Sequence, residues 1–325
     1  MTAPDSMIGF AIVGTGSVSR EIAHDLRLTG NARGFAVVSR DRQRGRAFAN
    51  EFGLERVHDD LGECLADPHV DVVYIATPHA THAALAEQAM LAGKHVLVEK
   101  PITISAAELG RLTDLAANSG LFLMEAMWML FNETIRDVLD QVYAGAIGDV
   151  RSVQASLGMR MPRETQATWS RERGDSALLN QGIYPLTLAH ALLGVPESIH
   201  SRSTAVGDGV DASGHVTLEY SEGRFAQLAW SMVEPIAQSA TINGTQGWIS
   251  IAPPFWFAER AELQPAGYPV PPVHEIFHAR EGWGYTPMLR AVAGAVRRGD
   301  TDASIHSLRE TAEIFDLMNR VRTQR

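Results

Sequence analysis

The stretch from Val72 to Pro101 constrains the fold of this chain more than any other part of the sequence. It begins VVYIATPH and ends AGKHVLVEKP, so it contains two short apolar runs rich in β-branched residues. Such runs are typical of parallel strands that are buried on both faces of a sheet. Between them, Thr81 can begin a helix and Gly93 can end it. The pattern predicts strand, helix and strand within one parallel sheet.

A lysine follows the second of these runs. Pro101 disfavours a helical conformation at Lys100, so the ammonium group is expected just beyond the strand His95–Val98. Ligands of open α/β sheets bind beyond the carboxyl ends of the strands. A single lysine is most often a solvated surface charge, but the context Glu99-Lys100-Pro101 at the end of a buried strand favours a functional role.

The start of the chain predicts a nucleotide site beside that lysine. The apolar strand Ile8–Val13 runs into Gly14-Thr-Gly16-Ser-Val-Ser19 and then into a helix. In the dinucleotide fingerprint, the first glycine allows a tight turn and the second lets the backbone approach the pyrophosphate, whose charge the helix N-terminus binds. Ser19, at the third glycine position, is still small enough for close helix packing. The residues expected to hold the pyrophosphate are Gly14, Thr15, Gly16, Ser17 and Val18.

The end of the second strand, Phe35–Val38, indicates which dinucleotide binds. The chain continues there as SRDRQR. An NAD site usually places a carboxylate at this strand end to accept from the ribose 2′-hydroxyl, whereas an arginine accommodates the 2′-phosphate of NADP. Ser39, Arg40 and Arg44 favour NADP(H) over NAD(H), because a guanidinium group pairs with phosphate through its planar fork. Asp41 leaves an NAD site open as the alternative.

Composition excludes several classes of protein. The chain has 325 residues, of which 45% are hydrophobic and 20% charged, as expected for an ordinary enzyme of two domains. Its net charge of −10 argues against a nucleic-acid partner. A single cysteine, Cys64, rules out an internal disulfide framework and suits the cytoplasm. The most apolar segment, Leu121–Phe131, is too short to span a membrane, and we recognise no signal peptide.

Twelve histidines raise the question of a metal site. They are scattered along the chain without cysteine partners. His79 and His82 lie three residues apart at the start of a predicted helix, but the sequence offers no evident third ligand. We therefore predict no metal.

The pattern of elements divides the chain into two predicted domains. Residues 1–124 alternate strands and helices, which predicts a parallel, doubly wound Rossmann domain. Residues 125–325 predict an α/β domain with a large, mostly antiparallel open sheet, followed by helices near 285–298 and 304–322. The strands expected in this sheet are Val150–Leu157, His215–Tyr220, Arg224–Met232, Ser239–Asn243 and Trp248–Ile251.

Taken together, these motifs resemble the glucose-fructose oxidoreductase / inositol dehydrogenase superfamily (Gfo/Idh/MocA), and within it the dimeric dihydrodiol dehydrogenase branch. The resemblance covers nearly the whole chain. It rests on Gly14-Thr-Gly16, Ser39-Arg40, Ala76-Thr-Pro-His79, Ala92-Gly-Lys-His-Val96, Glu99-Lys100-Pro101, Glu125-Ala-Met-Trp128, Ala177-Leu-Leu-Asn180-Gln-Gly-Ile-Tyr184, Gly282-Trp-Gly-Tyr285 and Ser307-Leu-Arg-Glu310.

The resemblance implies an enzyme that moves a hydride between NADP(H) and a hydroxyl carbon of a sugar, cyclic polyol or diol. It also implies that the second sheet forms a homodimer or a dimer of dimers. Lys100 would lie near the nicotinamide and the reacting oxygen, and Tyr184 would be the proton donor, helped by an ammonium that lowers the pKa of the phenol. Further cofactor contacts would come from Thr77, Pro78, His79, His82 and Glu99.

Several positions depart from the family pattern. Asn180 stands where an aspartate is usual, four residues before Tyr184 and so on the same face of a helix; it can orient a hydroxyl but cannot accept a proton. Asp175 is a candidate for the missing charge. Leu130 replaces a common arginine, for which Arg160 or Arg163 would substitute. As walls for a substrate ring we expect Trp128 and Trp169, although buried tryptophans are more often core residues.

Two function classes remain open on the sequence. The first is the NADP(H)-dependent oxidoreductase, with a small-molecule substrate and neither a membrane nor a nucleic acid as partner. The second is a non-catalytic NADP(H)-binding sensor or regulatory protein of the same fold, which the aspartate-to-asparagine change at Asn180 makes less remote. The presence of both Lys100 and Tyr184 favours the enzyme; His79 is the alternative proton donor.

Overall fold

A computed structural model describes residues 7–161, 169, 174–207, 209–267, 269 and 272–323 of the chain. The chain forms two compact units. The first contains Met1–Phe131 and Glu281–Thr311, and the second contains Asn132–Arg280 and Ala312–Arg325. Residues 281–311 thus belong to the first unit, whereas the sequence pattern assigns them to the second domain.

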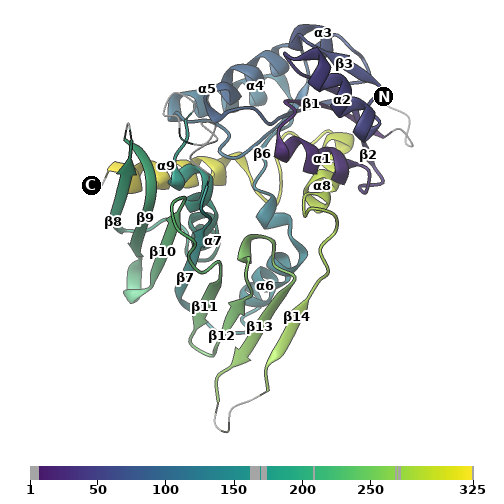
Figure 1. Cartoon of the computed structure of the whole chain (residues 1–325). Helices are drawn as coiled ribbons and strands as arrows, with labels where there is room; N and C mark the ends of the chain where they lie inside the picture. The colour runs from purple at the N-terminus through teal and green to yellow at the C-terminus, as the bar shows by residue number, and fades with distance from the viewer. Residues whose placement is uncertain are drawn as a thin grey trace. The chain divides into compact units, whose positions relative to one another are not determined.

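The first unit is built on a six-stranded parallel sheet with the order β3-β2-β1-β4-β5-β6. This order is that of a dinucleotide-binding fold, so the predicted Rossmann architecture is confirmed. Figure 1 labels β1, β2, β3 and β6 of this sheet. Every residue of β1 and β4 is buried, which explains their continuous apolar sequences. The strands are β1 Ile8–Val13, β2 Ala32–Val38, β3 Arg56–His58, β4 Val72–Ile75, β5 His95–Val98 and β6 Leu123–Glu125.

Helices flank this sheet. Helix α1 packs against α8, and α4 packs against α5. Because α8 follows the second unit in sequence, its place beside α1 is set by long-range contacts. The elements are α1 Ser17–Leu26, α2 Arg42–Phe52, α3 Leu61–Leu65, α4 His82–Leu91, α5 Ala106–Ser119 and α8 Thr286–Arg298, with the 3-10 turns η1 His79–Thr81 and η2 Trp128–Phe131.

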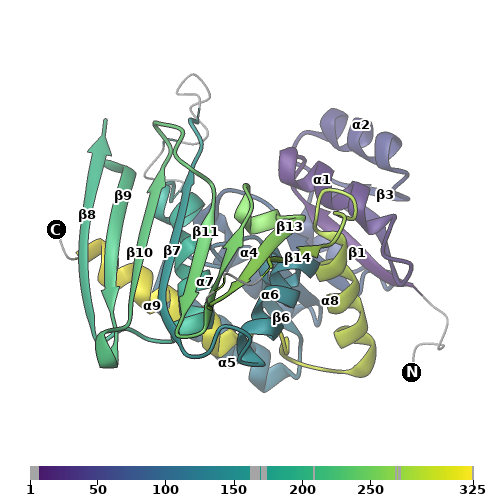
Figure 2. The same cartoon turned by 90° about the horizontal axis from the view of Figure 1, so that it is seen from below.

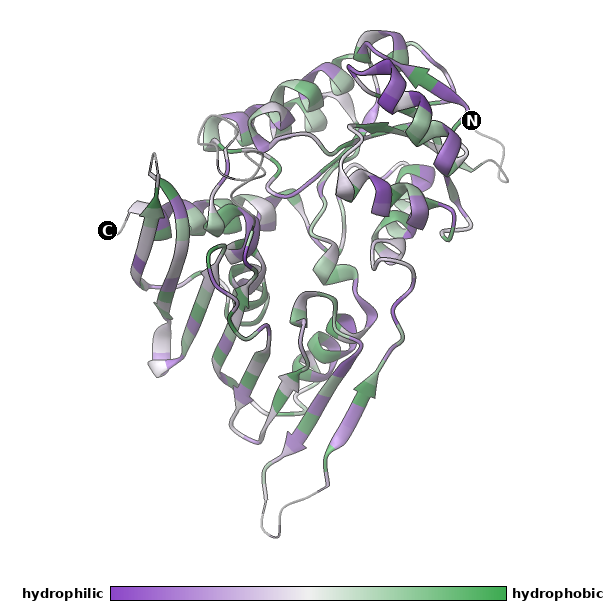
Figure 3. Ribbon diagram, viewed as in Figure 1, coloured by the Kyte–Doolittle hydropathy of each residue, from purple (hydrophilic) through white to green (hydrophobic). Residues whose placement is uncertain are grey.

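The second unit contains an eight-stranded sheet with the order β14-β13-β12-β11-β7-β10-β9-β8. Only β7 and β10 pair in parallel, so the predicted large and mostly antiparallel sheet is confirmed. Apolar and polar residues alternate along many of its strands (Figure 3), as in a sheet covered on one face. The strands are β7 Val150–Gly158, β8 Ser198–Val206, β9 Val210–Glu219, β10 Phe225–Ser231, β11 Ala240–Gly244, β12 Gly247–Ile251, β13 Arg260–Pro265 and β14 His274–Phe277.

Helices α6 and α7 lie on one face of this sheet (Figure 2). Helix α9 begins in the first unit and continues into the second. Within the described ranges, no helix is long and apolar enough to cross a membrane. The remaining elements are α6 Glu133–Tyr143, the π-helical turn η5 Leu178–Gly182, α7 Ile183–Leu193, α9 Leu308–Thr323, and the 3-10 turns η6 Ser221–Gly223 and η7 Phe255–Phe257.

Candidate functional site

The glycine turn after β1 has two glycines with different requirements. Gly14 has φ +111°, and a Cβ there would lie 2.7 Å from the carbonyl oxygen of Ala76, so the protein's own backbone requires glycine. Gly16 has φ −73°, and a Cβ there would meet no protein atom within 4 Å. Neither backbone strain nor packing against the protein requires a glycine at position 16. A glycine of this kind is expected where a ligand approaches the backbone closely.

The first turn of α1 supplies the donors for such a ligand. Gly16 is the N-cap residue, and it and Ser17 are exposed. The first N–H groups of a helix have no partner within the helix and carry its positive dipole end, so they bind phosphate well. At the third fingerprint position, Ser19 is fully buried against the turn. The turn therefore fits the pyrophosphate of a dinucleotide.

The end of β2 carries a hydroxyl and exposed guanidinium groups. Ser39 is buried, and its Oγ donates to the carbonyl oxygen of Asp41 at 2.9 Å. The Asp41 carboxylate caps α2 by accepting from the N–H of Arg44 at 3.0 Å, and it pairs with the Arg44 Nε at 3.0 Å. These bonds hold the pKa of Asp41 below its ordinary value, the backbone N–H contributing most. Arg40 is exposed beside this cap.

The loops after β4 and β5 are joined by His82. Its ring is fully buried, with Nε2 at 2.8 Å from the carbonyl oxygen of Thr77 and Nδ1 at 2.9 Å from that of Pro101. Burial lowers the pKa of His82, and the two carbonyl acceptors oppose that effect. The contact of His82 with the cofactor remains a prediction. Both ring nitrogens lie within hydrogen-bond distance of a backbone carbonyl, and the single N–H of the neutral ring donates to one of them. It serves the site by holding two loops together. The ring of half-buried His79 lies 5.6 Å from it.

Lys100 lies at the carboxyl end of β5, as predicted. The adjacent Glu99 is buried, and its carboxylate accepts a 2.5 Å hydrogen bond from the hydroxyl of Tyr74 on β4. Burial raises the pKa of Glu99 to about 7, against the pull of the Lys100 ammonium and the Tyr74 hydroxyl. Burial also lowers the pKa of Lys100, and the charges of Glu99 and Glu125 oppose this. Burial therefore works against the charged form of both neighbouring residues, and the charge of each favours the charge of the other.

Glu125, at the end of β6, holds the segment that follows Lys100. One carboxylate oxygen accepts from the N–H of Ile102 at 2.9 Å, and the other lies 3.0 Å from Nε2 of buried His306. The sequence motif around Glu125 gave no indication of this role. Together with His82, it fixes the backbone on the far side of the lysine.

Trp128, a candidate substrate wall, stacks on Tyr285 with ring centroids 4.6 Å apart. Both side chains are buried within the first unit. Tyr285 also hydrogen-bonds Glu21 of α1. Contact between Trp128 and a substrate remains a prediction.

In the second unit, Asn180 and Tyr184 lie on a helical segment that is not a regular α-helix. Asn180 is part of the π-helical turn η5, and Tyr184 follows in the first turn of α7. The α-helical spacing on which we placed them on one face therefore does not apply there. Asn180 is half-buried and its Nδ2 donates to the carbonyl oxygen of Ser176, while Tyr184 is buried with its ring 6.0 Å from that of Trp256. Single π-turns are frequent at functional sites.

The rest of the motif around Asn180 serves to hold this turn. Gln181 is buried, and its amide bonds both the N–H and the carbonyl of Met159 at the end of β7. Asp211 of β9 accepts from the N–H of Leu178 at 2.8 Å. A Cβ on Gly182 would lie 2.9 Å from the buried Trp230 ring. Gln181 and Gly182 thus serve the backbone and the core. Tyr184, and Asn180 through its Oδ1, stay the motif's predicted candidates for chemistry, since the Nδ2 of Asn180 already donates to the backbone.

Three other predicted site residues are at least partly exposed. Arg160 is exposed just after β7, Trp169 is half-buried, and Asp175 is half-buried before η5. Arg163 lies outside the described residues.

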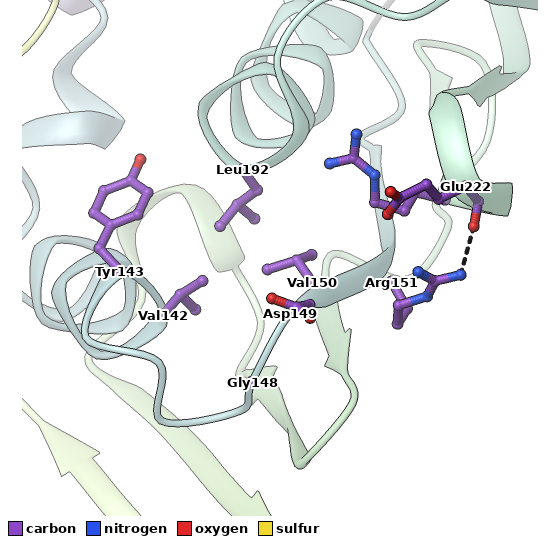
Figure 4. A pocket seen from close by; sticks show the side chains of 9 residues that line it. Val142, Tyr143, Gly148, Asp149, Val150, Arg151, Leu192 and Glu222 are labelled. Carbon is purple, nitrogen blue, oxygen red and sulfur yellow. Dashed lines mark hydrogen bonds between the residues drawn. The ribbon is translucent and has the colours of Figure 1, made fainter.

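A cavity of about 280 Å³ in the second unit contains none of the predicted site residues (Figure 4). Its two guanidinium groups bond the turn η6: Arg151 donates to the carbonyl of Glu222, and Arg224 to the carbonyl and hydroxyl of Ser221. Asp149 and the ring of Tyr143 line the same cavity. These bonds explain the arginines as supports of the turn.

Comparison with known proteins decides the family. Residues 8–127 match an oxidoreductase family with an NAD-binding Rossmann fold, and residues 134–250 match the Gfo/Idh/MocA C-terminal domain. The chain belongs to this oxidoreductase family. The resemblance inferred from the motifs is confirmed, as is an NAD(P)-binding Rossmann fold.

Two relatives and one solved structure illustrate the match. Trans-1,2-dihydrobenzene-1,2-diol dehydrogenase of Sus scrofa is 31% identical over 328 residues, covering 96% of this chain and 95% of the relative. A dTDP-3,4-didehydro-2,6-dideoxy-α-D-glucose 3-reductase of Streptomyces violaceoruber is 37% identical over 238 residues, covering 72% and 67%. A 3-ketoreductase from Actinomadura kijaniata, in complex with NADP and TDP-benzene, has a TM-score of 0.86 and 25% identity, with 98% of both chains covered.

Proposed function

We propose that this chain is an NADP(H)-dependent oxidoreductase that transfers a hydride to or from a hydroxyl carbon of a ring-shaped diol, polyol or sugar. The observation that carries the choice of cofactor is the end of β2. Ser39 offers no carboxylate to a ribose 2′-hydroxyl, and the carboxylate of Asp41 is already used as the cap of α2. The exposed Arg40 remains as a partner for a 2′-phosphate.

The chain's own residues would bind the cofactor and move one proton. The glycine turn and the first turn of α1 would hold the pyrophosphate, and the loop from Thr77 to His79 would line the site beyond β4. Bound NADP(H) supplies the hydride chemistry. Lys100 would hold the reacting oxygen in place with its ammonium group, and Tyr184 would give or take the hydroxyl proton at its phenolic oxygen.

The substrate class rests on what the relatives act on. The dehydrogenase acts on a dihydrodiol of a six-membered carbon ring, and the reductase acts on a six-membered sugar. Both carry neighbouring oxygens on a ring. We propose the same arrangement for the substrate of this chain, with Asn180 binding a second hydroxyl through its amide in place of the carboxylate that is usual in the family.

A turnover screen tests this function. NADP⁺ reduction would be followed with cyclic diols, inositols and sugars, and NADPH oxidation with the matching ketones, each in parallel with NAD(H). We expect turnover of at least one ring alcohol with a preference for NADP(H), and its loss in Tyr184→Phe. Tight NADP(H) binding with no turnover of any substrate would instead favour the non-catalytic sensor, and a preference for NAD(H) would refute the cofactor proposal.

A further inference from the structure

Tyr74 is an unusual residue for the centre of a parallel sheet. It lies within the apolar run of β4 and its side chain is fully buried. A buried hydroxyl costs free energy unless it is hydrogen-bonded, and an apolar residue would fill the same place without that cost. The hydroxyl has its partner in Glu99 Oε1 at 2.5 Å.

The sheet itself brings these two side chains together. Tyr74 pairs in register with Leu97 of β5. Side chains two residues apart on a strand lie on the same face, so Glu99 is the diagonal neighbour of Tyr74 across the two strands. A one-residue change of register would separate them. The contact between Tyr74 and Glu99 is thus set by the pairing register of β4 and β5.

Glu99 is also the chain neighbour of Lys100, and the two charges depend on each other. Burial works against the ionised form of both groups, while each opposes that effect in the other. A hydrogen bond that favours the carboxylate ion of Glu99 therefore also favours the ammonium ion of Lys100.

We propose that Tyr74 is a positioning residue for Lys100 that acts through Glu99: its hydroxyl favours the ionised form of the Glu99 carboxylate, and this negative charge favours the ammonium form of the neighbouring lysine. This deepens the proposed function, because it names what keeps the proposed catalytic lysine charged. The hydroxyl can donate to a carboxylate and favours its ionised form. Without it, Glu99 takes up a proton more readily, the negative charge is lost, and Lys100 gives up its own proton at lower pH.

Other titratable groups lie around Tyr74, Glu99 and Lys100. Lys100 also faces Glu125, whose carboxylate is held by Ile102 and His306, and the imidazole of His82, which is bonded to two carbonyls. Tyr74 faces Tyr285 and, beyond it, Glu21 of α1.

The sequence makes a direct measurement possible, because Lys94 and Lys100 are the only lysines in the chain. Protein labelled with carbon-13 and nitrogen-15 in lysine alone should give two side-chain NMR signals, whose pH titration can be followed in the intact chain without substrate. Lys94 donates to the carbonyls of Asp67 and Val70 and is the internal reference. Lys100→Arg assigns the signals.

We expect Tyr74→Phe to move the Lys100 titration to lower pH while the Lys94 signal behaves as in the wild type. Tyr220→Phe is the matched control, because it also removes the hydroxyl of a buried tyrosine, one that lies in the second unit. An unchanged Lys100 titration in Tyr74→Phe, or an equal change in Tyr220→Phe, would overturn the proposal.

A double-mutant cycle tests whether Tyr74 acts through Glu99. Glu99→Gln should by itself lower the Lys100 titration, and adding Tyr74→Phe to it should cause no further change. If Tyr74→Phe shifts the Lys100 titration as much in the Glu99→Gln background as it does in the wild type, Tyr74 does not act through the carboxylate. If Tyr74→Phe does not fold, the Glu99→Gln titration decides, and an unmoved Lys100 signal overturns the proposal. Because the signal is read without turnover, loss of the proposed activity would leave this result standing.

Discussion

The carboxylate of Asp25 occupies the space that a side chain on Gly282 would need. Asp25, on α1, is fully buried and accepts from the N–H groups of Trp283, Tyr285 and Thr286 at 2.9 to 3.2 Å. It therefore neutralises the positive start of α8 and fastens the segment 283–286 to helix α1. This contact explains the first glycine of the motif before α8, Gly282.

The first prediction concerns that contact. Gly282 has φ +60°, so Gly282→Ala combines left-handed strain with an overlap on the carboxylate and should lower the free energy of unfolding by roughly 2–4 kcal/mol. Gly299→Ala is the control: it also has a positive φ, +79°, but open space around the Cβ, and should cost only about 1–2 kcal/mol. Denaturant titration measures both. An equal loss of unfolding free energy in the two variants would mean that overlap with the Asp25 carboxylate contributes nothing to the cost of Gly282→Ala.

The elements that sequence predicted well are those encoded by local pattern. Strand β1 has the predicted bounds Ile8–Val13, because a continuous apolar run bounded by glycine admits one interpretation. Lys100 lies at its strand end for the same reason. Strands β8, β13 and β14 were not predicted. Their residues are largely polar or exposed, as in SIHSRSTAV from 198 to 206, and they form strands because the neighbouring strands offer a hydrogen-bonding edge.

The parts of the site that sequence could not predict depend on contacts between distant residues. The role of Asp25 requires α8 to lie beside α1, and the role of His82 requires the loops after β4 and β5 to meet. The π-turn before Tyr184 arises where Gly182 meets Trp230 and Gln181 pairs with Met159. No spacing rule within the motif contains that information.

A second prediction concerns cofactor choice. Arg40→Ala should weaken NADP(H) binding far more than NAD(H) binding, because a charge-assisted hydrogen bond to the 2′-phosphate contributes roughly 1.5–3 kcal/mol. Arg111→Ala removes an exposed arginine from α5 and is the control. Calorimetric titration with both cofactors measures the difference. Equal losses for the two cofactors, or a wild-type preference for NADH, would contradict the assignment.

The buried carboxyl of Glu99 predicts a dependence of stability on pH. Its pKa in the folded chain is about 7, whereas an unfolded glutamate titrates near about 4.3. Between these values the folded chain holds a proton that the unfolded chain has released, so this group's contribution to stability falls as pH rises through the window. Because glutamine does not titrate, Glu99→Gln should lose less stability over this range, by roughly 3–4 kcal/mol. Urea unfolding of the wild type and of Glu99→Gln at a series of pH values measures this. An equal slope of unfolding free energy against pH in the two proteins would refute the prediction.

Assembly is the subject of a fourth prediction. In β12, residues 247, 249 and 251 are buried, so Trp248 points to the opposite face of the sheet, where its side chain is 41% exposed. The chain is expected to be at least a dimer at micromolar concentration through this face, and Trp248→Asp should weaken it. Leu91→Asp, at an exposed apolar residue of α4, should not. A monomer mass for the wild type by light scattering at all concentrations would rule the dimer out.

The last prediction tests catalysis. If Lys100 and Tyr184 serve the same proton, Lys100→Met and Tyr184→Phe should each lower turnover by roughly 10²–10⁴-fold. The double variant should be little worse than either single one, because groups that act as a unit are not additive. Both variants should still bind NADP(H), since the glycine turn and the end of β2 are untouched.

Asn180→Asp, measured beside these variants, tests whether the amide at position 180 is needed for activity. Restoring the carboxylate that is usual in the family could raise activity on ordinary family substrates, and it would lower activity if the native substrate needs the amide. Turnover within about threefold of wild type in both Lys100→Met and Tyr184→Phe would fall far short of a general acid–base contribution. That result would remove both residues from the mechanism and make His79, which lies in the turn after β4, the next proton donor to replace.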